Sequence, residues 1–301
     1  MTLFNVIGFV LSIGIFFASF LAGNDLALYY SLNAFLLVLF GVSGSMFLSY
    51  PFRRIKSAFS VMIKAYWFKL PKEDDIVNAL LDFALKSKYE GILSLEDETN
   101  RSTSLFLKDG LGMVVDGYSS EEMKDVLSTE MYFFKQRREQ SERIFRSMAK
   151  TAPAFGLIGS VVGLMQMLSG IGDAGVIIRT IPIALLSTLY GILFSNFVFT
   201  PIAEGIYART QSELLLSNVI INGLIAINNE QDTYKLEKKL CSFLSPSVRP
   251  KHEKSFKELR RQYFMAKRRP GKKEGTPIPT ALTPLPPLSG GLTPESLIKP
   301  N

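Results

Sequence analysis

Four uncharged apolar stretches constrain this chain more than any other feature of its sequence. They cover residues 1–24, 26–52, 151–172 and 180–203. Each is long enough for a helix to cross a hydrocarbon core of about 30 Å, which takes about 20 residues. Buried helices of a large soluble protein are the alternative, but 301 residues cannot surround four of them. We predict an all-α membrane protein with four transmembrane helices in two hairpins and a helical cytoplasmic domain between the second and third.

Basic residues beside these stretches predict the orientation, because Lys and Arg favour the cytoplasmic side. The turn at Asn24 and Asp25 has none. Six follow the second stretch: Arg53, Arg54, Lys56, Lys64, Lys69 and Lys72. No Lys or Arg precedes the first stretch, so it lacks the basic start of a secretory signal and is expected to be retained. Both termini are expected in the cytoplasm.

The chain divides into six predicted regions. They are a first transmembrane hairpin at 1–52, a cytoplasmic helical domain at 53–150, a second hairpin at 151–204, a cytoplasmic amphipathic helix at 205–248, a basic segment at 249–274 and a disordered Pro-rich tail at 275–301.

Two local patterns refine this division. Ser119 and Glu122 have the spacing of a capping box and predict the start of a helix. Gly110, Gly112 and Gly117 are expected to mark turns or breaks in the segment before that helix.

Residues 249–273 hold eleven Lys or Arg against two Glu, which accounts for the net charge of +7. Such a run can bind anionic lipid, or it can be a solvated tail that satisfies the preference for positive charge in the cytoplasm. Nucleic-acid binding is not expected, because no aromatic platform or recognisable fold presents the charge.

The sequence argues against an enzyme. One cysteine, Cys241, and one histidine, His252, exclude a disulfide framework, a Cys/His zinc site and a Cys/His catalytic pair. We expect no cofactor and no metal. The apolar stretches also lack ionisable side chains, which mark proton relays in membranes. If ions cross here, the titrating carboxylate must come from another polypeptide.

Small residues form a stripe along the third and the fourth stretch. Such stripes let helix backbones approach closely in lipid, either within one chain or against a partner's helix. Mid-span Ser160, Ser187 and Thr188 need polar partners, which a second helix or a line of water and ions would supply. The residues assigned to partner-helix packing are Ala152, Gly156, Gly159, Gly163, Ala184, Gly191 and Ser195.

Two prolines lie near the cytoplasmic ends of these stretches. Pro153 and Pro201 each remove a backbone hydrogen bond and bend or loosen a helix. They mark either helix ends or a pair of hinges to the cytoplasmic helices.

Taken together, several segments resemble the MotA/PomA stator subunits of the bacterial flagellar motor, in the family's order from residue 1 to about 249. APAFGLIG followed by ALLSTLYG is the most specific signal. The matching segments are LLVLFGVSGSMFLSYPFRRIKSAF, KYEGILSLEDE, LKDGLGMVVDG, MAKTAPAFGLIGSVVGLMQML, IPIALLSTLYGILFSNFVFTPIAE and LIAINNEQDTYKLEKKLCSFLSPSVR. The related ExbB and TolQ proteins have one span before their cytoplasmic domain, so the second N-terminal span favours MotA/PomA.

The resemblance implies an ion-driven motor in the bacterial inner membrane. Five copies of the chain would surround two helices of a MotB/PomB-like subunit, whose single span carries an ion-binding Asp. Passage of H⁺ or Na⁺ would drive torque on a FliG-like protein of the rotor's C-ring.

The resemblance also assigns roles to residues of this chain. Pro153 and Pro201 match two essential prolines, and Thr188 matches a hydroxyl beside the ion path. Ser160 and Ser187 stand where sodium-driven members usually have Thr, which leaves the coupling ion open. Lys88 and Glu96 match the charges that act on the rotor; Lys88 replaces the usual Arg and so loses its planar fork.

Two other functions remain as alternatives. A related ExbB/TolQ-type motor would use the same ring of subunits and partner Asp to power a different process. A membrane scaffold without ion flow would use its hydroxyls and glycines for packing alone, and would then tolerate Thr188→Val.

Overall fold

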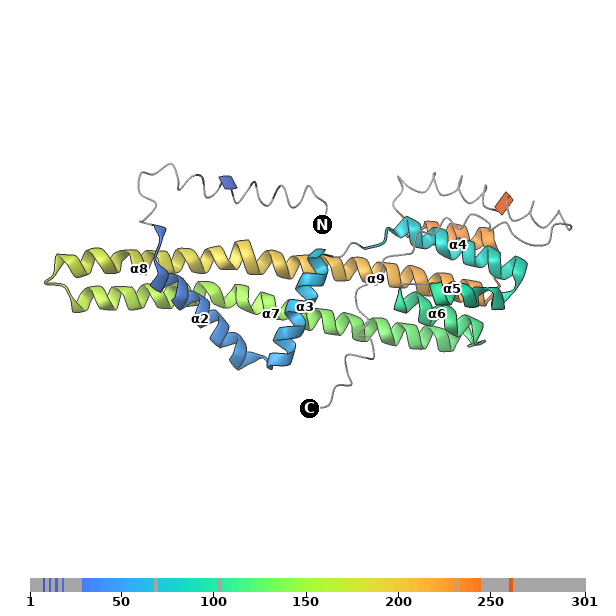
Figure 1. Cartoon of the computed structure of the whole chain (residues 1–301), viewed down its shortest axis with the longest axis horizontal. Helices are drawn as coiled ribbons and strands as arrows, with labels where there is room; N and C mark the ends of the chain where they lie inside the picture. Colours follow the sequence, from blue (N-terminus) through green and yellow to red (C-terminus); the bar gives the residue numbers. More distant parts are fainter. Residues whose placement is uncertain are drawn as a thin grey trace. The chain divides into compact units, whose positions relative to one another are not determined.

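A computed structural model describes residues 29–67, 70–101, 104–230 and 232–244, together with positions 8, 11, 14, 15, 18, 260 and 261 (Figure 1). Helices account for most of the described residues, and no strand occurs among them. The predicted span at 1–24, His252, most of the basic segment 249–274 and the tail 275–301 lie outside the described residues, apart from the isolated positions.

The chain forms two compact units. The first contains residues Met1–Trp67 and Gln136–Arg209, and the second contains Phe68–Lys135 and Thr210–Asn301. Two long helices contribute to both units, α7 (Ser120–Ser169) and α9 (Thr200–Asn228).

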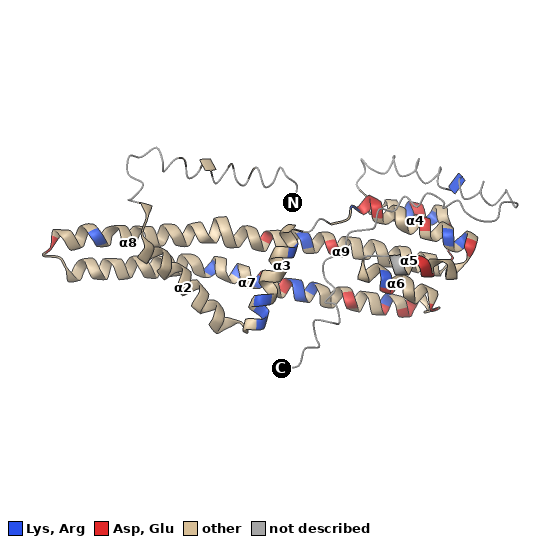
Figure 2. Cartoon of the chain, in the orientation of Figure 1, with Lys and Arg blue, Asp and Glu red and all other residues tan. Residues whose placement is uncertain are grey.

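The first unit consists of apolar helices. It contains α2 (Leu32–Ser49), α3 (Phe52–Trp67), the later part of α7, α8 (Ala174–Leu193), a π-helical turn (Phe194–Phe199) and the start of α9. Among the described residues, three helical segments are long and apolar enough to cross a membrane: α2, a part of α7, and the continuous run from Ala174 to Asn228. Figure 2 shows that α2 and the paired parts of α7 and α8 carry almost no charge except near the turn that joins them.

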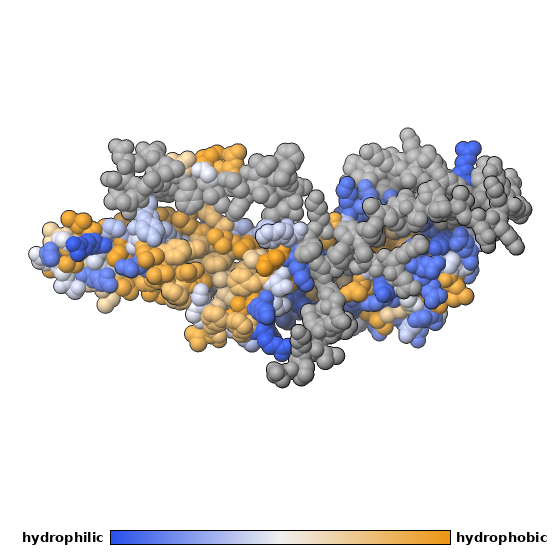
Figure 3. Space-filling view, in the orientation of Figure 1, coloured by the Kyte–Doolittle hydropathy of each residue, from blue (hydrophilic) through white to orange (hydrophobic). Residues whose placement is uncertain are grey.

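Large apolar side chains cover the outside of this unit. Exposed side chains of α7 include Leu157 (61% exposed) and Met165 (65%), and those of α8 include Leu185 (69%). Figure 3 shows the resulting hydrophobic surface over α2 and the adjoining helices. Water does not tolerate so large an apolar surface on a monomer, so this unit is the membrane-embedded part of a multi-pass protein.

The second unit has a conventional hydrophobic core. It contains α4 (Glu73–Glu90), the 3₁₀ turn Ile92–Leu95, α5 (Glu96–Arg101), α6 (Leu105–Val115), the first part of α7, the remainder of α9 and α10 (Thr233–Cys241). Its fully buried side chains include Leu80, Leu107, Leu111, Leu127 and Leu224. The single cysteine, Cys241, is buried there.

The predicted capping box is confirmed. Glu122 Oε2 accepts hydrogen bonds from the backbone N–H of Ser119 (2.9 Å) and from its hydroxyl (2.7 Å), and Glu122 N donates to Ser119 Oγ (3.2 Å). These bonds favour the ionised carboxylate and lower the pKa of Glu122. They fix the first turn of α7.

Two local expectations were wrong. Gly110 and Gly112 lie inside α6, and only Gly117, at a φ of 77°, occupies a turn. The helix expected over 205–248 is interrupted, because α9 ends at Asn228 and α10 starts at Thr233. Asp232 caps α10 by accepting a hydrogen bond from Tyr234 N, which competes with continuation of α9.

Candidate functional site

The later part of α7 and α8 pack with their backbones in close approach. A Cβ atom added at Gly156 would lie 2.8 Å from Ser187 O, and one at Gly191 would lie 2.6 Å from Ala152 O. At Gly163 it would lie 2.9 Å from the backbone of Ala184. Only glycine fits these positions, since the obstructing atoms belong to a neighbouring backbone. The two stripes of small residues therefore face each other.

This packing corrects the assignment of the stripes to a partner's helix. Ala152, Ala184 and Ser195 are at most 8% exposed within the single chain. The remaining members, Gly156, Gly159, Gly163 and Gly191, are also buried. Of the two arrangements that the sequence allows, the structure has the contact within the chain, because each stripe finds a complementary stripe on the other arm of its own hairpin.

Two hydroxyls meet at this contact. Ser160 Oγ lies 2.6 Å from Thr188 Oγ1 and donates a hydrogen bond to Ala184 O at 2.5 Å. Gly156 O lies 3.3 Å from Ser160 Oγ and 3.5 Å from Thr188 Oγ1. Two hydroxyl oxygens and two carbonyl oxygens of α7 and α8 thus form one hydrogen-bonded cluster, in which Ser160 and Thr188 are both half-buried.

The hydrogen-bond inventory of the pair indicates what can bind there. A hydroxyl has one hydrogen to donate and two lone pairs that accept. The hydrogen of Ser160 is used by Ala184 O, so Thr188 donates to Ser160. Lone pairs on both oxygens remain, and the position therefore suits a cation, a water molecule or a protonated carboxyl group.

Ser187 does not join this pair. It is fully buried, its hydroxyl donates to Ile183 O of its own helix at 2.7 Å, and its side chain faces Gly159. The sequence predicts an ion path lined by Ser160, Ser187 and Thr188. The structure brings two of these residues together and places the third in the helix contact.

The prolines lie within continuous helix. Pro153 is inside α7, and Pro201 is in the first turn of α9, directly after the π-helical turn. A proline ring clashes with the carbonyl four residues earlier, and the wider π-helical turn relieves such crowding before Pro201. Neither proline ends its helix, so the interpretation as a helix end is wrong.

Ser195 compensates for Pro153. Because proline has no N–H, the carbonyl of Ala149, four residues earlier, loses its helical donor. The hydroxyl of Ser195 donates to Ala149 O at 2.7 Å. This bond joins the end of the fourth apolar stretch to the start of the third, beside the proline.

Further contacts surround Pro201. Tyr66 of α3 donates to Pro201 O at 3.0 Å. Arg146 Nη2 lies 3.0 Å from Glu204 Oε1 and its Nε lies 2.6 Å from Glu142 Oε1. The parts of α7 and α9 at the end of the apolar region are therefore linked by side chains rather than by a loop.

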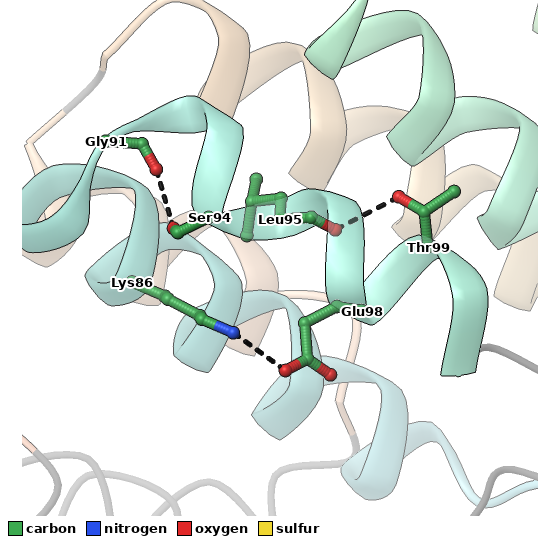
Figure 4. A network of polar contacts seen from close by, with 6 residues as sticks. All are labelled: Lys86, Gly91, Ser94, Leu95, Glu98 and Thr99. Atoms are coloured by element: carbon green, nitrogen blue, oxygen red, sulfur yellow. Dashed lines mark hydrogen bonds and ion pairs between the residues drawn. The ribbon is translucent and has the colours of Figure 1, made fainter. Parts of the chain in front are cut away.

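A separate group of charges lies in the second unit, where α4 turns into α5. Lys88 and Glu96 are both exposed there. In the same corner, Lys86 Nζ lies 2.9 Å from Glu98 Oε1, and the Glu98 side chain is only 9% exposed (Figure 4). Leu95, also drawn in Figure 4, is fully buried. The ion pair and the buried leucine therefore stabilise this corner, at which Lys88 and Glu96 are exposed.

Gly91 makes this corner possible. Its φ of 92° lies in the region that favours glycine, and it ends α4 at Glu90. Ser94 Oγ donates to Gly91 O at 2.6 Å and Thr99 Oγ1 donates to Leu95 O at 3.0 Å (Figure 4). Both bonds stabilise the turn between α4 and α5.

Sequence reasoning missed several residues that position these sites. Tyr190 OH donates to Tyr29 O at 2.7 Å and accepts from Ser31 N at 3.1 Å, which ties α8 to the start of α2. Lys86 and Glu98 brace the exposed corner. The tyrosine within an apolar span was a usable signal, because a phenol hydroxyl among apolar side chains needs a polar partner.

Comparisons with known proteins agree with this geometry. The model of the MotA/TolQ/ExbB proton channel family matches residues 98–218. The uncharacterized protein YtxD of Bacillus subtilis (strain 168) is 32% identical over 254 residues, covering 83% of this chain and 93% of that protein. Chemotaxis protein PomA of Vibrio alginolyticus is 27% identical over 249 residues, covering 83% of this chain and 98% of PomA.

A solved structure is also similar. The structure of C. jejuni MotAB superposes with a TM-score of 0.76 and 25% identity, covering 82% of this chain and 97% of that chain. The family resemblance of the sequence is thus confirmed. The chain belongs to the MotA/TolQ/ExbB proton channel family, as a stator subunit of its MotA/PomA branch.

Proposed function

We propose that this chain is the flagellar stator subunit that couples a flow of H⁺ or Na⁺ across the inner membrane to torque on the rotor. The observation that carries the proposal is the Ser160–Thr188 pair, which offers lone pairs for a cation or a protonated group between two glycine-packed helices. No cofactor is needed, since the transported ion supplies the energy.

The acid that titrates comes from a partner. The apolar stretches of this chain carry no ionisable group, so a MotB/PomB-like helix with an Asp completes the path. The exposed apolar side of α7, with Leu157, Val161 and Leu164, offers this helix a surface beside half-buried Ser160. Five copies around two partner helices would place one such surface at each step of a ring.

The topology follows from the charges. Four helices span the membrane, counting the first apolar stretch at 1–24, and both termini lie in the cytoplasm. Arg53 and Arg54, in the first turn of α3, follow α2 on that side. The second unit is then cytoplasmic and can reach a FliG-like rotor protein.

Motion passes through the two prolines. Pro153 and Pro201 each weaken the hydrogen-bond ladder of a long helix where the apolar region ends. A change at the hydroxyl pair would bend α7 and α9 there and move the cytoplasmic helices. Exposed Lys88 and Glu96 would act on the rotor by charge, over a distance set by ionic screening.

Swimming of a deletion strain tests the function. We expect paralysed cells that still carry filaments, and restored swimming on complementation. Comparison of swimming with and without sodium identifies the ion. Unchanged swimming in a strain without a second stator set would overturn the proposal and favour the ExbB/TolQ-type alternative, which co-purification of the partner would then identify.

Variants at the hydroxyl pair test the site. Thr188→Val keeps the shape but removes the lone pairs, and we expect it to abolish swimming at normal membrane levels. Thr188→Ser keeps the hydroxyl and should retain most of the torque. A Thr188→Val strain that swims normally would support a scaffold without ion flow.

A further inference from the structure

Helix α3 has one side packed against the protein. Ile55, Ala58 and Ala65 are buried in a cluster with Phe145 and Ile206. Phe59 adds an edge-on contact with the ring of Phe145 at 5.5 Å between centroids. In Figure 1, α3 runs across α7 rather than alongside it. The remaining sides of α3 can therefore contact lipid, water or another molecule.

An aromatic side of α3 continues the apolar surface of α2. Tyr50 and Pro51 separate the two helices, and Phe47 of α2 stacks on Phe52 of α3 at 6.4 Å between centroids. Leu48 at the end of α2 is 91% exposed. The exposed large apolar side chains along α3 are Phe52 (68%), Phe59 (40%), Ile63 (47%), Tyr66 (38%) and Trp67 (79%). Because α2 is a membrane-spanning candidate, the same lipid that covers its end can cover this side of α3.

Beside the aromatic side lies positive charge without compensation from its own segment. Arg53 and Lys56 are exposed and Lys64 is half-buried. Residues 26–72 contain no Asp or Glu at all. Long basic side chains of this kind reach from an apolar surface to polar groups several ångströms away. Figure 2 shows the blue Lys and Arg positions on the ribbon of α3 next to the uncharged ribbon of α2.

We propose that α3 lies in the membrane–water interface and binds the phosphate groups of anionic phospholipids through Arg53, Lys56 and Lys64. An aromatic side with adjacent Lys and Arg is the pattern of helices that lie in this interface, with the apolar side about 5–10 Å below the headgroups. Charge complementarity favours anionic lipid over a second copy of the chain, since a second copy would bring the same uncompensated charges to this surface. The proposal concerns the membrane-embedded unit and does not depend on ion coupling.

The first test uses Trp67, which is the only tryptophan of the chain. The full chain is placed in nanodiscs whose phospholipids carry bromine either near the glycerol or near the methyl end, and Trp67→Phe provides the background signal. We expect stronger quenching by bromine near the glycerol. Two results would overturn the proposal. Quenching of Trp67 by aqueous acrylamide but by neither brominated lipid would mean that Trp67 is exposed to water. Quenching by none of the three reagents would mean that protein covers it.

The second test removes charge. The triple variant Arg53→Gln, Lys56→Gln and Lys64→Gln is compared with Lys72→Gln, Lys108→Gln and Lys124→Gln, which removes as much charge from exposed positions on other segments. The readout is the ratio of phosphatidylglycerol to phosphatidylcholine that co-purifies with the full chain. Each charge near an anionic leaflet is worth a factor of about five in association, so the α3 variant should lose its enrichment and the control should keep it.

The single variants guard against misfolding of the triple variant. Each should lower the enrichment by part of the total while Trp67 quenching in neutral nanodiscs stays as in the parent chain. Equal enrichment for the parent, the α3 variant and the control would overturn the lipid assignment, and the same result in all single variants would do so independently.

Discussion

The two units of this molecule differ in the kind of side chain that packs inside each of them. In the second unit, leucines such as Leu80, Leu107 and Leu127 fill a core from which water is excluded. In the membrane-embedded unit the close contact between α7 and α8 is made by Gly156, Gly191 and other small residues, and the large apolar side chains lie outside.

The solvent explains this inversion. Water drives apolar area into a core at roughly 25 cal/mol per Å², but lipid tails are as apolar as leucine and offer no such gain. Helices in lipid must therefore gain from close packing and hydrogen bonds. The same helix, α7, follows both rules, since its first part belongs to the second unit and its later part to the membrane-embedded unit.

The largest expected effect tests the leucine core. Leu107→Ala removes a side chain that is 1% exposed and leaves a cavity, so the second unit should lose about 2–5 kcal/mol of unfolding free energy. Leu105→Ala, in the same helix but 43% exposed, is the control and should cost much less. Native-state proteolysis of the solubilised chain measures both. Equal sensitivity of the two variants would show that the core assignment of α6 is wrong.

A smaller loss of stability is expected when a methyl group is added at the glycine contact between α7 and α8. Gly191→Ala adds a methyl group that would meet Ala152 O at 2.6 Å, and overpacking of this kind costs about 1–3 kcal/mol. Gly44→Ala in α2 is the control, because no atom lies within 4 Å of its added Cβ. Thermal unfolding in detergent should separate the two. If Gly191→Ala is as stable as Gly44→Ala, the close approach of α7 and α8 is contradicted.

Much of this contrast could be predicted from the sequence, but not the neighbours of each helix face. The spacing of the stripes through Gly156 and Gly191 places their members on one side of each helix, because helical periodicity is local. Whether that side meets its own hairpin or a partner is a tertiary question, and the structure shows the hairpin. The capping box at Ser119 could be predicted because both its members lie within one turn.

Contacts between residues on either side of a turn could not be predicted from the sequence. Lys86 and Glu98 are brought together only by the corner at Gly91, and Ser195 meets Ala149 O only because the two apolar arms are paired. The break between α9 and α10 did leave a signal, since Asp232 directly precedes a helix-forming segment. The prediction of one helix over 205–248 followed the apolar spacing, which continues past Asp232.

Each unit also contains a polar contact, and the one in the membrane-embedded unit should contribute more to stability than the one in the second unit. Ser195→Ala leaves the carbonyl of Ala149 without its donor beside Pro153, at a cost of about 1–2 kcal/mol. Ser187→Ala is the matched control, since that hydroxyl bonds only within its own helix. The measurement is again thermal unfolding in detergent, and swimming of the two strains provides a second comparison. Similar losses for both variants would mean that Ser195 is not compensating for the proline.

The smallest effect concerns the ion pair of the second unit. Glu98→Gln removes the charge opposite Lys86, but the 19% exposed Lys86 side chain can turn to water, so we expect a loss of about 0.5–1 kcal/mol. Added salt should shrink the difference from the parent chain, because screening already weakens a partly exposed pair. Glu96→Gln at the exposed neighbouring position should leave proteolytic stability unchanged while it weakens torque. A loss for Glu98→Gln larger than that of Ser195→Ala would reverse the expected order, and would mean that water competes less for polar groups at this corner than the exposure of Lys86 implies.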